Sequence, residues 1–349
     1  MRRGFRWRSL GLSAFALLVL LAAGDAVYWR IVAGQLDSGF RAWIAAQRAA
    51  GWTVRGTPPR FGGWPLAATL TTTRISLSGG KLDFPGGMDW DAGRLVLRVA
   101  LLHPEQLQAI PSGVQHLRLG TGPAIPFTAG TMQAVVPLQP DQPPRTVILH
   151  ATDLRAGLAG GGSTFTIGRL QAQLDSQPSA AKPALGFAIQ ATSLALPGQY
   201  RWALGPSIEA VTLDGTLTGP FPATPDLTAR ATAWRDGGGA LELRRLHLNW
   251  GPLSLTANAR LGLDQQLQPA GHAEARVAGY DATLDALATA GALSPSAALA
   301  AKAVLSLMAQ PAANGKPAEV DVPLRLQNGT LFMQTMPLVR LPVLDWPLP

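Results

Sequence analysis

The sequence predicts a mainly β protein: an N-terminal transmembrane helix, then an elongated, curled antiparallel sheet with a short helical pair near the C-terminus. Three observations predict this fold. Apolar and polar residues alternate with period two through most of the chain, as in half-buried strands. Turn formers separate these runs, with 38 glycines and 29 prolines in 349 residues. The N-terminus is basic and then apolar, as in a membrane anchor.

Residues 1–33 are interpreted as a cytoplasmic basic head followed by a transmembrane signal anchor. The basic residues that precede the apolar run 10–23 are Arg2, Arg3, Arg6 and Arg8. Small residues near the end of the run also fit a cleavable signal peptide. Apolar character resumes after Asp25, and the aromatic pair Tyr28 and Trp29 follows, which favours an anchor with an interfacial belt. Under either interpretation, the positive-inside rule places the rest of the chain across the membrane.

A juxtamembrane helix is predicted within residues 34–51, from Gln35 to Ala50. Its apolar residues Leu36, Phe40, Trp43 and Ile44 fall at helical spacing, and Gly51 is a typical C-terminal stop. This helix leads into the β-rich part of the chain.

Residues 52–349 are predicted to form one β-rich periplasmic domain. The clearest hairpin turns at Gly251-Pro252, between an alternating run ending at Trp250 and a second run over 253–263. The alternation slips by one residue at Arg244-Arg245 and around Thr72-Thr73, which predicts β-bulges or bends. Similar short segments at 63–66 and 250–253 suggest two related halves, 52–230 and 231–349.

Near the C-terminus the pattern changes to helical. Asp281 is predicted to cap a helix over 282–290, and Ser294-Pro295 to start a second helix that ends near Ala309. A strand over 320–326, a tight turn at Asn328-Gly329 and a return strand follow. The proline-rich tail is predicted to be irregular.

Composition excludes several classes of protein. Charged residues make up only 14% of the chain, which argues against charge-driven disorder. The absence of cysteine excludes disulfides and thiolate chemistry. The net charge is +8, and setting aside the four head arginines leaves +4 for the body. Because no basic run with interleaved aromatics occurs in the body, we expect no nucleic-acid partner.

The sequence contains no motif that predicts an enzyme, a cofactor or a metal site. The five histidines have no metal-ligand spacing and are interpreted as solvated strand residues. Asp83, Asp89 and Asp91 lack the oxygen spacing of a calcium loop. The glycines at 160–162 precede a strand without a lysine, which is typical of a hairpin turn rather than a phosphate loop. We therefore expect no catalytic, cofactor-binding or metal-binding residues.

The remaining candidate for function is apolar surface. A curled sheet presents a concave face, and an open apolar face is suited to acyl chains. The candidate lipid-facing groove residues are Leu246, Leu248, Trp250, Leu253, Leu255 and Leu261. A closed core requires the same alternation, so the sequence leaves open whether these residues line a groove or a core.

Several turn motifs carry a resemblance to a known group. They are Gly63-Trp64-Pro65-Leu66, Trp250-Gly251-Pro252, Val322-Pro323-Leu324, Asn328-Gly329, Met336-Pro337 and Leu341-Pro342. With the anchor and the helix around Trp43, the chain resembles an uncharacterised domain-of-unknown-function family of alphaproteobacterial membrane-anchored envelope proteins. That family is similar in style to the AsmA-like group. The resemblance implies a curled periplasmic sheet with a role in lipid handling or outer-membrane upkeep.

We therefore expect a non-enzymatic envelope protein, single-pass in the inner membrane, with its bulk in the periplasm. The main functional hypothesis is binding or transfer of phospholipid or another envelope lipid through an apolar β-groove, in outer-membrane maintenance. The alternative is a periplasmic scaffold or assembly factor that binds another envelope protein through a sheet edge.

Overall fold

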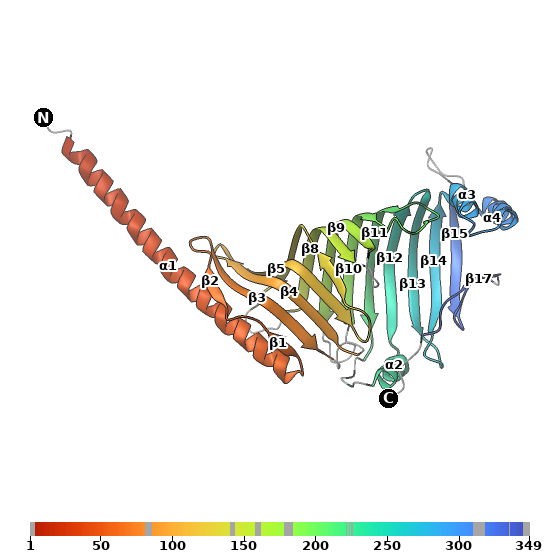
Figure 1. Ribbon diagram of the computed structural model, residues 1–349, viewed down its shortest axis with the longest axis horizontal. Coiled ribbons are helices and arrows are strands. Elements are labelled where there is room, and N and C mark those ends of the chain that lie inside the picture. The colour runs from red at the N-terminus through yellow and green to blue at the C-terminus, as the bar shows by residue number, and fades with distance from the viewer. Residues whose placement is uncertain are drawn as a thin grey trace.

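The computed structural model describes residues 4–80, 86–139, 144–157, 162–177, 184–220, 222, 224, 226–309, 318–334 and 336–344. The described chain forms a 17-stranded sheet and four helices, which confirms the predicted mainly β class. Figure 1 shows a long helix at one end of a bent sheet and a pair of short helices at the other end.

The first helix, α1 (Gly4–Ala49), is a single 46-residue element. At a rise of 1.5 Å per residue it is about 69 Å long, more than twice the ~30 Å hydrocarbon core of a bilayer. The predicted anchor and juxtamembrane helix are therefore continuous, with Gly34 inside the helix. The helix ends as predicted before Gly51, which has a φ of +83° and donates to the Arg48 carbonyl.

One helix of the described chain, over Phe15–Ala49, is long and apolar enough to cross a membrane, as an anchor or a signal sequence would be. Its N-terminal apolar side chains are exposed, including Phe15, Leu18 and Leu20. Its C-terminal half packs on the sheet instead. The N-terminal half of α1 is therefore an exposed apolar segment, and its C-terminal half is part of the folded domain.

The strands form an antiparallel meander. Each strand pairs with its sequence neighbour, except that β1 and β2 both pair with β3, and that β6 and β7 both bridge β5 and β8. The bounds are β1 Thr53–Arg55, β2 Arg60–Gly62, β3 Ala67–Gly79, β4 Met88–Ala100, β5 His103–Leu119, β6 Ile125–Thr128, β7 Thr131–Pro137, β8 Thr146–Gly157, β9 Thr164–Gln177, β10 Ala184–Ala195, β11 Ser207–Thr218, β12 Ala240–Trp250, β13 Leu253–Leu263, β14 Pro269–Ala278, β15 Glu319–Gln327, β16 Thr330–Met333 and β17 Met336–Arg340.

Both predicted phase slips are bends in the sheet. Between β12 and β13, Leu243 faces Ala259 and Leu246 faces Ala257, so Arg244 and Arg245 form a bulge. In β3, the slip falls at Arg74, whose φ is 51°. A bulge returns the next apolar residue to the same face, which keeps the face apolar through the bend.

A further bend, which the sequence analysis missed, crosses three adjacent strands. Asp153 in β8 and Ser193 in β10 both have positive φ values, 50° and 56°. They lie level with Gly168 of β9, at which an added Cβ would lie 2.9 Å from the Ser193 Cβ. Because the three strands shift phase together, their hydrogen bonding continues on both sides of the bend.

The C-terminal helices partly confirm the prediction. The second helix of the pair, α4 (Pro295–Met308), begins as predicted, since the Ser294 hydroxyl accepts from the Ala297 amide. The first, α3 (Tyr280–Thr289), is capped by Gly279 in the left-handed region, so the predicted cap at Asp281 is wrong. Asp281 instead lies 2.9 Å from the Lys302 Nζ.

The acidic residues of α3 hold α4 through one lysine. Lys302 Nζ donates to Asp285 at 2.7 Å and also pairs with Asp281. The hydrogen bonds that the Lys302 ammonium donates to Asp285 and Asp281 raise the pKa of Lys302 above its ordinary value. These ion pairs hold α3 and α4 together on their outer side, while the apolar residues of both helices pack inward.

Two further elements differ from the prediction. Helix α2 (Leu227–Asp236) was missed; the Asp226 side chain caps it by accepting from the Ala229 amide. The tail was predicted to be irregular, but it contains β17, which pairs with β16. The predicted turn at Asn328-Gly329 is present, with φ values of 52° and 68°.

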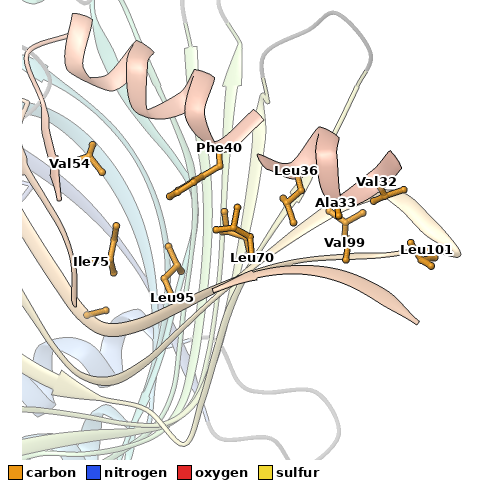
Figure 2. Packing of buried hydrophobic residues seen from close by; sticks show 13 residues of the cluster. Val32, Ala33, Leu36, Phe40, Val54, Leu70, Ile75, Leu95, Val99 and Leu101 are labelled. Atoms are coloured by element: carbon orange, nitrogen blue, oxygen red, sulfur yellow. The ribbon is translucent and has the colours of Figure 1, made fainter. Parts of the chain in front are cut away.

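The largest hydrophobic core lies between α1 and the β3–β4 end of the sheet. Figure 2 shows Leu36 and Phe40 of α1 above Leu70 of β3, with Leu95 and Val99 of β4 beside them. Leu70 is fully buried, at 0% exposed. The Trp29 indole also donates to the Ala67 carbonyl at 2.9 Å, which fixes the height of the sheet along the helix.

Candidate functional site

One face of the sheet carries apolar rows that run from β3 to β15. Residues paired across antiparallel strands lie on the same face, so the register traces each face directly. A row that crosses the sheet from β3 to β15 contains Leu70, Leu97, Ala109, Ala134, Leu149, Ala172, Ile189, Leu213, Leu246, Ala257, Ala275 and Val322. Every member of this row is apolar. We call the surface that contains it the apolar face.

A second row lies two residues along the strands on the same face. It contains Val147, Leu174, Phe187, Gly215, Leu243, Ala259, Ala273, Leu324 and Met333. The apolar face therefore has breadth along the strands as well as length across them.

The opposite face is polar. Its row through the middle of the sheet contains Gln133, His150, Gln171, Gln190, Thr212, His247, Thr256, Arg276 and Asp321. The contrast between the two faces explains the period-two pattern, because water solvates one side of each strand and the other side needs apolar neighbours.

Helices cover the apolar face at its two ends. At the β3–β5 end, Val32, Leu36 and Phe40 of α1 pack on it. At the β13–β15 end, Ala275, Val320 and Val322 form a core with Tyr280, Leu305 and Met308. The principal contacts of α2 are with β13.

Part of the middle of the apolar face is buried without a helix, because Ala151 and Leu154 of β8 form a small core with Phe127, Met132 and Leu170 of neighbouring strands. The rest of the middle has no such cover. Among the described helices, α1, α3 and α4 pack on other strands, and α2 reaches the end of β11, where the Trp234 indole donates to the Thr218 carbonyl at 2.8 Å. Leu174 is 47% exposed, Val147 is 38% exposed and Leu185 is 37% exposed. Phe187, Ile189 and Leu213 are half-buried by their neighbours. This uncovered stretch is the main feature of the described structure that indicates a binding partner, because folded proteins seldom leave apolar surface bare.

The predicted groove residues share the apolar face. Leu248 pairs with Leu255 and Trp250 with Leu253, while Leu246 pairs with Ala257 and Leu261 with Leu241. All six predicted residues are half-buried. Leu255, however, packs against the core beneath α3 and α4, so it belongs to the covered end. Contact with lipid stays a prediction for all six.

The apolar residues of β8–β11 on this face, of which Val147, Leu174 and Leu185 are exposed, were not among the predicted site residues. The same alternation marks them, for example in Leu149, Leu174 and Leu213. Only the packing of the helices distinguishes them from the residues of the covered ends.

An aromatic cluster closes one margin of the apolar face. The Trp250 indole donates to the Gly205 carbonyl at 2.9 Å. Its ring centroid lies 6.1 Å from that of Trp202, which in turn lies 5.9 Å from that of Tyr200. These contacts hold the loop between β10 and β11 over the end of β12. Both indole N–H groups have an acceptor, since Trp202 donates to the Pro197 carbonyl and Trp250 to the Gly205 carbonyl.

The titratable residues on the polar face form ordinary surface pairs. His116 Nδ1 lies 3.1 Å from Asp91, and Arg118 binds Asp89; Asp83 lies outside the described residues. A depression at the Arg244-Arg245 bulge is lined by ion pairs such as Arg276 with Asp321. In the described part of the chain, no group of three or more His, Asp or Glu residues is placed to hold a metal ion.

A comparison with models of protein families matches residues 29–342 to DUF2125, described as uncharacterized protein conserved in bacteria. The chain belongs to the DUF2125 family. No curated protein and no solved structure matches the chain. The match begins at Trp29, the residue whose indole binds Ala67, so the DUF2125 region includes the sheet-packed half of α1 and all the described strands.

Proposed function

We propose that this chain is a non-enzymatic envelope protein that binds lipid on its apolar face and helps to transfer it in outer-membrane maintenance. The proposal places α1 in the inner membrane and the sheet in the periplasm. The observation that carries it is the uncovered apolar surface over β8–β11, with Leu174 47% exposed. Folded proteins seldom leave large apolar patches bare unless a partner covers them.

The energetics favour acyl chains as that partner. Burying one methylene group contributes about 0.8 kcal/mol, so ten methylenes of a single chain contribute about 8 kcal/mol before entropic costs. The face offers leucine, alanine and phenylalanine side chains without a charged residue in the rows described above. Such a surface suits a ligand that needs no hydrogen bonds.

The path of α1 supplies a source of lipid. The helix continues unbroken from its exposed apolar stretch, past Asp25 and Arg30, to Val32 and Leu36, which pack on the apolar face. A lipid that leaves the bilayer beside α1 therefore meets apolar surface near the membrane. The apolar rows contact only acyl chains, so they do not select among lipid head groups.

A charge-substitution experiment tests this function. We expect the double variant Leu174→Glu, Leu185→Glu to carry at least about tenfold less co-purified phospholipid than the parent protein, because each carboxylate opposes an acyl chain by its desolvation cost. Both side chains are more than a third exposed, so folding should survive. The measurement is mass spectrometry of lipids extracted from full-length protein purified in mild detergent.

The matched control is Gln171→Glu, on the same strand as Leu174 but on the polar face. It adds a carboxylate without touching the apolar face and should retain lipid. Parent protein that carries no lipid, or equal lipid content in all three proteins, would contradict the proposed function.

The proposed topology predicts a reporter result. Because Arg2, Arg3, Arg6 and Arg8 precede the apolar segment, the N-terminus stays in the cytoplasm and the body is exported. A reporter fused after Pro349 should be active if it works only in the periplasm. Activity of a cytoplasm-only reporter at the same position would overturn the topology.

The sheet edge supports the alternative scaffold function. Strand β17 lies at the end of the sheet away from α1 (Figure 1), and all five of its side chains are exposed. An added strand from another envelope protein could pair there. A photo-crosslinking residue separates the two functions: Val339 should yield protein adducts in cells if the edge is used, whereas Leu174 should yield lipid adducts if the apolar face is used.

A further inference from the structure

Two neighbouring turns at the α1 end of the sheet expose large apolar side chains. The β2–β3 turn carries Trp64, 54% exposed, and Leu66, 74% exposed, and Phe61 in the middle of β2 is 47% exposed. The β4–β5 turn carries Leu102, which is 87% exposed. We call Phe61, Trp64, Leu66 and Leu102 the apolar tip.

Hydrogen bonds hold the two turns side by side. Ala67 pairs with Ala100 at the end of the β3–β4 ladder, and the Leu101 amide donates to the Leu66 carbonyl at 3.1 Å. Leu101 points into the core at 7% exposed, whereas Leu102, the next residue of the same tight turn, points outward. The exposure of the tip is therefore a property of a rigid strand end.

The tip lies where the exposed apolar stretch of α1 meets the sheet. Ala67, directly after Leu66, accepts the hydrogen bond from the Trp29 indole at 2.9 Å. Trp29 follows Tyr28 at the end of the apolar segment, the place at which interfacial aromatics occur in membrane helices. Figure 1 shows the start of β3 and the β2 region alongside the middle of α1.

We propose that the apolar tip inserts into the interfacial region of the membrane that α1 crosses, as a second contact beside the helix. Tryptophan and leucine are the side chains that favour this depth, with the polar His103 and Glu105 next to Leu102 able to remain in the headgroup layer. Because α1 already packs rigidly on the sheet, a second contact beside the helix fixes the tilt of the whole molecule relative to the bilayer. The membrane-proximal end of the apolar face is then held against the bilayer.

The bilayer is the occupant that the geometry favours over a second copy or another protein. The tip is small, four side chains on two turns, which is far below the area of a stable protein interface. Its position is set by α1 itself, so every membrane-anchored molecule brings the tip to the membrane surface. This inference rests on the proposed anchoring by α1, but it does not require lipid to bind over β8–β11.

Nitroxide depth measurements test the inference on the full chain reconstituted in phosphatidylethanolamine–phosphatidylglycerol vesicles. The chain has no cysteine, so Leu102→Cys, Leu307→Cys and Leu20→Cys each introduce one labelling site. Leu307 is a matched control, since it is 88% exposed but lies on α4 at the far end of the sheet. Leu20 reports on the anchor.

We expect the label at position 102 to be several-fold more accessible to oxygen, relative to a water-soluble nickel chelate, than the label at position 307. The label at position 20 should show a still higher ratio. Equal ratios at 102 and 307, with position 20 in the bilayer, would overturn the tip proposal while leaving the anchor intact. Shielding of position 102 from both relaxants would also overturn it, because that result indicates burial against protein. A water-exposed label at position 20 would remove the anchor and the tip together.

Discussion

Replacing Leu70 with alanine is expected to lower the free energy of unfolding by about 2–5 kcal/mol. The side chain is 0% exposed and lies between β4 and α1, packed with Leu97, Leu36 and Phe40. Removing it deletes buried methyl groups and leaves a cavity. The cavity persists because α1 and the paired strands β3 and β4 cannot easily move together to fill it. Since native domains are stable by only about 5–15 kcal/mol, this is a large fraction of the total.

The measurement is denaturant unfolding of full-length protein in micelles, followed by tryptophan fluorescence and by the strand signal in circular dichroism. The matched control is Leu307→Ala, because that leucine is 88% exposed and its truncation should change stability by less than about 0.5 kcal/mol. Equal stability of the two variants would show that α1 does not pack on the sheet as described.

A second large effect is expected for Gly279→Ala. Gly279 caps α3 with a φ of +71°, and an added Cβ would lie 1.9 Å from the Pro252 carbonyl oxygen. The alanine therefore meets both left-handed strain, about 1–2 kcal/mol, and a backbone clash that forces the helix away from the β12–β13 turn. We expect a loss of stability of at least about 3 kcal/mol in total, with the core beneath α3 and α4 opened.

Gly291→Ala separates the two causes. Gly291 has a similar φ of +74°, but an added Cβ would have no atom within 4 Å. It should lose only the strain energy, about 1–2 kcal/mol. If the two variants unfold at the same denaturant concentration, the close approach of Gly279 to Pro252 does not exist in solution.

The local chemistry of the sequence predicted much of the fold. Alternation in 253–263 determined β13 and its faces, and the slip at Arg244-Arg245 located a bulge, because a strand has only two faces and a slip needs an extra residue. The cap of α4 was readable because Ser294 bonds within its own turn. The missed helix α2 and the wrong cap of α3 show the limit of this reasoning. A side chain at position 279 would clash with the Pro252 carbonyl, and Pro252 is distant along the chain.

The candidate site follows the same division. The sequence by itself determined that each strand has one apolar side, including Leu246, Leu255 and Leu174, because period-two patterning is a property of neighbouring residues. Only the tertiary structure decided that Leu255 lies under the C-terminal helices while Leu174 stays uncovered. Covering depends on where α1, α3 and α4 pack, and that is settled by contacts between segments far apart in the chain, which no local pattern records.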